Sequence, residues 1–135
     1  MSRKQSRELA FKLLYQLAFN GGEVLNDESL KLVTDEKVDT VEMEYIRTLC
    51  NHVQTNKETI DAHIERLSSG FKLDRMFSVD ITVLRLALAE ILYMPTPNVV
   101  VVDTCLTIAK KYSTDKSSGF VNGILATFLK EQDGK

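Results

Sequence analysis

Residues 78–94 read SVDITVLRLALAEILYM, the most apolar segment of the chain. Its valines, leucines and alanines fall on more than one face of a helix with about 3.6 residues per turn, so the segment predicts a helix that is buried on most sides. Pro95 and Pro97 must end this helix, because proline lacks the backbone donor and disfavours helix in the preceding residue. We expect the rest of the chain to pack around it.

Four further helices are predicted before this segment, each from apolar residues at helical spacing. The first ends at Asn20-Gly21-Gly22, residues that tolerate the left-handed conformation common after helices. The third opens on Asp39 and Glu42, which have the spacing of a capping pair. The expected ranges are 2–19, 27–34, from Asp39 to Val53, and from Asn56 to Leu67.

Two more helices are predicted after residue 94. The valines at 99–102 favour a strand by propensity, but helical spacing continues to Tyr112, and a lone strand would have no partner. The expected order is a helix over 98–112, a polar loop over 113–118, a last helix capped by Ser117 or Ser118, and a frayed tail over 131–135. The prediction is therefore an all-α, compact single domain, residues 1–135, with about seven helices around the buried helix.

Composition limits the class of protein. A chain of 135 residues with 44% hydrophobic residues can bury a core without disulfides or metal. Cys50 and Cys105 lie in apolar segments without close Cys or His neighbours, so we interpret them as small buried hydrophobes in a reducing compartment. No segment of the sequence approaches the roughly 20 consecutive apolar residues that a membrane span needs. We expect a cytoplasmic protein.

Charge is unevenly distributed along the chain. The net charge of −2 argues against a general nucleic-acid binder, but Arg3, Lys4 and Arg7 gather at the start of the first helix while residues 23–44 are strongly acidic. Arginine forks and free backbone N–H groups at a helix start suit phosphate oxygens. The alternative is that these cations only solvate the helix face.

Residue patterns typical of catalysis are absent from the sequence. His52 and His63 are eleven residues apart, and the chain contains no zinc-ligand spacing, nucleophile elbow or glycine-rich phosphate loop. We therefore expect no enzyme activity, no metal site and no cofactor.

A motif near the C-terminus identifies a family. Residues 120–125 read FVNGIL and follow IAKKY at 108–112. Taken alone, Asn122-Gly123 is first a hairpin signal. Together with VDITVLRLALAE at 79–90 and RELAFKLLYQ at 7–16, the motif resembles the NusB family of bacterial transcription antitermination factors. The segment is therefore interpreted as a helix and not as a hairpin. Gly123 is expected to let a neighbouring helix approach closely.

The resemblance implies a function for several residues. In this family the basic start of the first helix contacts boxA, a short single-stranded RNA element of the nascent transcript. Arg3, Lys4 and Arg7 match those positions. From their chemistry, Lys116 suits a further phosphate contact, and Tyr15 or Phe120 suits base stacking, although such aromatic residues more often belong to the core.

The resemblance also implies partners. NusB proteins bind NusE, a small-subunit ribosomal protein, and the pair acts on ribosomal-RNA transcripts to hold RNA polymerase in an antiterminating state. Asp80 and Arg75 match the region of the NusE contact, although Asp80 alone reads as a first-turn carboxylate. Other readings remain: a protein-only adaptor docking through residues 23–44, or a detached domain of an RNA cytosine methyltransferase. Monomer and homodimer both remain open.

Overall fold

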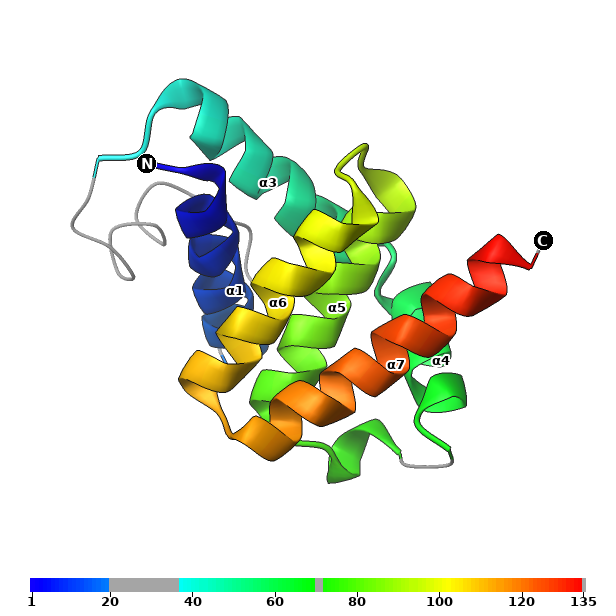
Figure 1. Ribbon diagram of the computed structural model, residues 1–135. Helices are drawn as coiled ribbons and strands as arrows, with labels where there is room; N and C mark the ends of the chain where they lie inside the picture. Colours follow the sequence, from blue (N-terminus) through cyan, green and yellow to red (C-terminus); the bar gives the residue numbers. More distant parts are fainter. Residues whose placement is uncertain (20–36, 70–71, 135) are drawn as a thin grey trace.

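The computed structural model describes residues 1–19, 37–69 and 72–134, and within them it is all-helical (Figure 1). The all-α prediction is confirmed, whereas the helix expected at 27–34 lies outside the described residues. The elements are α1 (Arg3–Phe19), α3 (Thr40–Thr55), α4 (Lys57–Leu67), a 3₁₀ turn η1 (Leu73–Arg75), α5 (Ser78–Tyr93), α6 (Asn98–Tyr112) and α7 (Asp115–Asp133).

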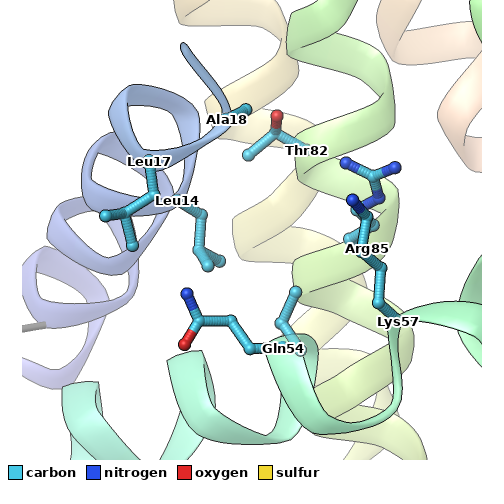
Figure 2. A pocket seen from close by; sticks show the side chains of 8 residues that line it. Leu14, Leu17, Ala18, Gln54, Lys57, Thr82 and Arg85 are labelled. Atoms are coloured by element: carbon cyan, nitrogen blue, oxygen red, sulfur yellow. The ribbon is translucent and has the colours of Figure 1, made fainter. Parts of the chain in front are cut away.

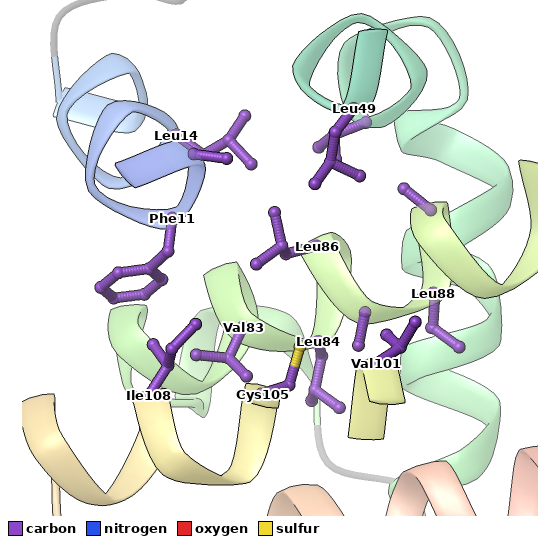
Figure 3. Close-up of a cluster of buried hydrophobic side chains, with 14 of the residues drawn as sticks. Phe11, Leu14, Leu49, Val83, Leu84, Leu86, Leu88, Val101, Cys105 and Ile108 are labelled. Atoms are coloured by element: carbon purple, nitrogen blue, oxygen red, sulfur yellow. The ribbon is translucent and has the colours of Figure 1, made fainter. Parts of the chain in front are cut away.

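Helix α5 is the centre of the molecule, as its composition predicts. It contacts α1, α3, α4, α6 and α7, and in Figure 1 it lies behind α6 and α7. Leu84, Leu86 and Leu88 are fully buried among side chains from the surrounding helices (Figure 3). Each buried leucine contributes roughly 1.5–3 kcal/mol relative to an exposed one, so this helix supplies much of the driving force for folding.

The four valines at 99–102 lie in the first turns of α6, as helical spacing predicts. Val101 is buried against the core and Cys105 follows it one turn later. Val99 stays 80% exposed. The strand propensity of valine is overridden, because the helix buries Val101 and places Cys105 on the same buried side one turn later.

Helix α7 begins and ends differently from the prediction. Thr114 is its N-cap and accepts a hydrogen bond from the backbone N–H of Ser117 at 3.1 Å. Ser117 is buried inside the first turn, so the cap expected at Ser117 or Ser118 is wrong, as is the polar loop beyond Thr114. The helix runs to Asp133, which contradicts the tail expected from residue 131.

Gly123 does not serve helix packing. It is exposed on α7, and a Cβ at this position would meet no atom within 4 Å among the described residues. The expected close approach of a neighbouring helix at Gly123 is therefore wrong.

Candidate nucleic-acid interface

Arg3, in the first turn of α1, is held by the start of α3. Its Nε and Nη2 donate to the Glu42 carboxylate at 2.9 and 3.1 Å, and its guanidinium lies 4.0 Å from the centre of the Tyr45 ring. Hydrogen bonds from Arg3 and from Ser6 hold the pKa of Glu42 below its usual range. The Arg3 side chain is still 46% exposed, so a positioned cation faces solvent here.

Arg7 lies in the interior. Its Nε and Nη2 donate to the two carboxylate oxygens of Glu90 at 2.7 and 2.8 Å, and its Nη1 donates to Thr104 at 3.2 Å. The side chains of Arg7 and Glu90 are 1% and 0% exposed. A phosphate cannot reach this guanidinium, so the expected phosphate contact at Arg7 is corrected to a buried structural contact.

The Arg7 contact belongs to a network that joins four helices. The Tyr45 hydroxyl of α3 lies 2.9 Å from both oxygens of Glu90, and Thr96, before α6, donates to Glu90 at 2.7 Å. Burial by itself raises the pKa of Glu90, but the hydrogen bonds from Arg7, Thr96 and Tyr45 outweigh it and lower this pKa. One sequence signal was missed: an acid within the most apolar helix requires a buried cation.

One face of α1 combines a cation with aromatic rings. Lys4, Phe11 and Tyr15 fall within about 40° of one another around the helix at 100° per residue. Lys4 is exposed and makes no ion pair with the described residues. Tyr15 is partly exposed, and its ring stacks on that of Phe11 at 5.9 Å with 25° between the planes. This face presents the Lys4 charge and part of the Tyr15 side chain to solvent, while Phe11 is buried.

The last turn of α6 lies against this face. The Tyr112 ring is 5.2 Å from the Phe11 ring. The ammonium groups of Lys12 and Lys111 lie 6.0 and 5.4 Å from the centre of the Tyr112 ring, and Lys111 also donates to Glu8 at 3.0 Å. Sequence reasoning missed this cluster, because α1 and α6 are distant in the chain and only the fold brings them together.

A groove of about 400 Å³ runs between η1, α5 and the start of α7. Phe77 stands 69% exposed beside it. The groove brings together residues expected for RNA, Lys116 and Phe120, with residues expected for a protein partner, Arg75 and Asp80. Its described lining is Arg75, Met76, Phe77, Asp80, Thr114, Lys116, Ser117 and Phe120.

Asp80 lies at the buried side of this groove and is only 4% exposed. Its Oδ2 accepts a hydrogen bond from the Ser117 hydroxyl at 3.2 Å, whereas its Oδ1 has no donor among the described residues. Burial raises the pKa of Asp80, and the Ser117 hydrogen bond offsets this only in part. A buried acceptor without a donor costs about 1–3 kcal/mol, so Asp80 keeps an unsatisfied oxygen beneath the groove.

A second hollow lies among α1, α3, α4 and α5 (Figure 2). Leu14 and Leu17 form its apolar side, and Gln54 and Lys57 border it. Arg85, which also lines it, is bound by both oxygens of Asp61 at 2.8 and 2.9 Å. None of the residues expected to bind RNA or a partner lies there.

The described residues contain no cluster of three or more metal-ligating side chains, and none of the described helices is long and apolar enough to span a membrane. Cys50 and Cys105 are both buried as expected, and burial raises the pKa of each thiol to about 12. These thiols are therefore protonated and unreactive near neutral pH.

Comparison with known proteins gives consistent matches. The transcription antitermination protein NusB of Natranaerobius thermophilus is 39% identical over 128 residues, 93% of this chain and 92% of that protein. A structure of T. maritima NusB has a TM-score of 0.87 and 36% identity, covering 97% of this chain and 92% of that one. A crystal structure of antitermination factors NusB and NusE in complex with dsRNA has a TM-score of 0.82 and 30% identity, covering 96% of both chains.

The NusB family model matches residues 4–130. This match spans every described helix except the first residue of α1 and the last turn of α7. Together with relatives that align over nearly the full chain, it establishes that the chain belongs to the NusB family.

Proposed function

We propose that this chain is an RNA-binding transcription antitermination factor. With a NusE-type ribosomal protein it binds boxA-type single-stranded RNA of nascent ribosomal-RNA transcripts and promotes antitermination by RNA polymerase. The observation that carries the proposal is the start of α1, where Lys4 is exposed and Arg3 is half-exposed, together with the partly exposed Tyr15 ring farther along the face that carries Lys4. Membership of the NusB family and the similarity to a NusB–NusE structure with RNA support it.

The chemistry of this face suits single-stranded RNA. Lys4 offers an ammonium group that the described residues leave unpaired, and Arg3 is oriented by Glu42. Such RNA is held by phosphate contacts together with bases stacked on aromatic rings, and the partly exposed Tyr15 supplies such a ring. Arg7 contributes indirectly, because its ion pair with Glu90 anchors the turn of α1 that carries Arg3 and Lys4.

The groove beside Asp80 suits a protein partner. Oδ1 of Asp80 lacks a donor among the described residues, and the exposed Phe77 ring offers apolar contact area. A partner segment with an apolar side chain would cover the Phe77 ring, whereas the buried Oδ1 of Asp80 lies beneath the groove and offers no surface to a docking group. Arg75 and Lys116 line the same groove. We propose that RNA bound with the partner also reaches Lys116 and Phe120, which explains why the pair would hold RNA better than either protein alone.

Lys4→Glu tests the RNA assignment most cleanly, because it leaves the Arg3–Glu42 pair in place. Binding of labelled boxA-like RNA is measured over a salt series, with Lys130→Glu in the last turn of α7 as the control of equal charge. Loss of one phosphate contact lowers the salt slope for single-stranded RNA by about 0.7. We expect weaker binding and this smaller slope for Lys4→Glu only. Identical curves for the two variants would contradict the RNA site and favour a protein-only adaptor.

A further inference from the structure

Two lysines converge on one tyrosine where α1 meets the end of α6. The Lys12 ammonium lies 6.0 Å and the Lys111 ammonium 5.4 Å from the centre of the Tyr112 ring. The negative face of an aromatic ring attracts cations at such distances. The ring itself is fixed by Phe11, 5.2 Å away, so the two charges are gathered around a rigid support.

The charges of this cluster do not cancel. Glu8 accepts hydrogen bonds from Lys111 at 3.0 and 3.1 Å, and its carboxylate raises the pKa of Lys111. Lys12 has no carboxylate partner among the described residues. The cluster therefore keeps one net positive charge at a surface where the Lys111 side chain is 55% exposed. Two like charges held around one ring attract an anion.

The cluster lies between the two surfaces described above. Phe11 joins it to Tyr15 and so to the α1 face. Tyr112 ends α6, and two residues later Thr114 lines the groove at the start of α7. An RNA strand that runs from the α1 face to that groove passes the Lys12, Lys111 and Tyr112 cluster.

We propose that Lys12 and Lys111, gathered at the Tyr112 ring, form a phosphate clamp that extends the RNA site from the α1 face toward the start of α7. This inference rests on the proposed function, since it assigns further contacts for the same ligand. A phosphate displaces Glu8 from Lys111, so Glu8 competes with RNA for this lysine. The clamp is indifferent to base sequence, because it contacts only the backbone.

The double variant Lys12→Gln with Lys111→Gln tests the clamp against the control Lys110→Gln with Lys130→Gln, which removes two exposed charges elsewhere. Binding of labelled boxA-like RNA is measured over a salt series, and thermal unfolding verifies the fold of each variant. Two lost contacts lower the salt slope by about 1.4. We expect this change in the clamp variant only, and we expect Glu8→Gln to bind RNA more tightly than the unmodified chain.

Equal slopes for the clamp variant and its control overturn the clamp. If Lys4→Glu still weakens binding in that case, the proposed function stands without it. If the unmodified chain binds no boxA-like RNA, with or without the ribosomal partner, the proposed function fails as well. An unchanged affinity in Glu8→Gln overturns the competition between Glu8 and phosphate for Lys111.

Discussion

Arg7 and Glu90 form the only fully buried ion pair in the described part of the chain, and it connects the first helix to the central one. Two charges can stay in an interior only when both are neutralised and hydrogen-bonded. Here Tyr45, Thr96 and Thr104 satisfy the remaining positions. This network fixes the helix that carries the proposed RNA face, so a change in the interior can affect the surface.

Arg7→Met is expected to destabilise the fold by about 3–5 kcal/mol, because it leaves the Glu90 carboxylate buried without its cation. Arg66→Met breaks an exposed ion pair with Glu131 and should cost below about 1 kcal/mol. Urea unfolding at pH 7 measures both losses. A loss in Arg7→Met as small as that in Arg66→Met would show that the network contributes little to stability.

The pH dependence of the stability difference between the unmodified chain and Arg7→Met supplies an independent test. The folded pKa of Glu90 is lowered, so its contribution to stability is present above the ordinary carboxyl pKa and is lost as the pH falls through the folded value. Without Arg7, burial dominates and raises the pKa of Glu90. The loss caused by Arg7→Met should therefore shrink as the pH falls toward 5. A constant difference between pH 7 and pH 5 would contradict this account.

At the scale of single residues, the sequence predicts which side chains lie near the core better than it predicts what those side chains contact. Arg3 and Arg7 are one turn apart on the same helix, and their periodicity places both near the edge of the core. Only the fold shows that Glu90, 83 positions away in the chain, is buried beside Arg7 and accepts a hydrogen bond from it. Glu90 within the most apolar helix indicates that a buried cation pairs with it, but neither segment shows that this cation is Arg7.

Helix α7 shows how local hydrogen bonds set the boundaries of an element. Thr114 caps its first turn, and the same turn places Ser117 so that its hydroxyl reaches Asp80 of α5. Val121, Ile124, Leu125 and Phe128 then bury one face of α7. The cap thus controls both the start of the helix and one wall of the groove beside Asp80.

Thr114→Ala should cost about 1 kcal/mol, the usual loss when an N-cap side chain is removed. Ser118→Ala is the matched control, because Ser118 lies inside the first turn and caps nothing. Chemical unfolding of the two variants measures the difference. If Ser118→Ala cost as much as Thr114→Ala, the helix would begin where the sequence predicted and not at Asp115.

Periodicity was sufficient to predict most of the described helices, since apolar spacing survives wherever a helix covers the core. It located α5, and it resolved the valines of α6 correctly. Caps were harder, because Ser113, Thr114, Ser117 and Ser118 all have side chains that can cap a helix. Which one does so depends on how the chain turns out of α6, which follows from tertiary packing.

Across the whole molecule, an acidic chain with a net charge of −2 presents two distinct surfaces. The α1 face, with the exposed Lys4 and the partly exposed Tyr15, is the surface proposed for RNA, while the groove between α5 and α7, with the exposed Phe77, is the surface proposed for a protein partner. The family motifs indicated both roles from the sequence. They did not show that Lys116 and Phe120 share the groove with Asp80, since three separate segments build it.

Asp80→Asn separates the two surfaces. Its amide oxygen is a weaker acceptor for the Ser117 hydroxyl than the carboxylate is, so the change loosens the α7 wall of the groove to which the partner is proposed to bind. Folding should tolerate the change, because the folded pKa of Asp80 is raised and its ionised form opposes folding at neutral pH. Asp115→Asn, in the exposed first turn of α7, is the matched control.

The most direct measurement is therefore the affinity of Lys4→Glu, Asp80→Asn and Asp115→Asn for two ligands, boxA-like RNA alone and the NusE-type ribosomal protein alone. We predict that Lys4→Glu weakens RNA binding and spares the protein partner, that Asp80→Asn does the reverse, and that Asp115→Asn changes neither. If Lys4→Glu and Asp80→Asn weakened both ligands equally, or if Asp80→Asn bound the partner as well as Asp115→Asn does, the assignment of two separate surfaces would be contradicted.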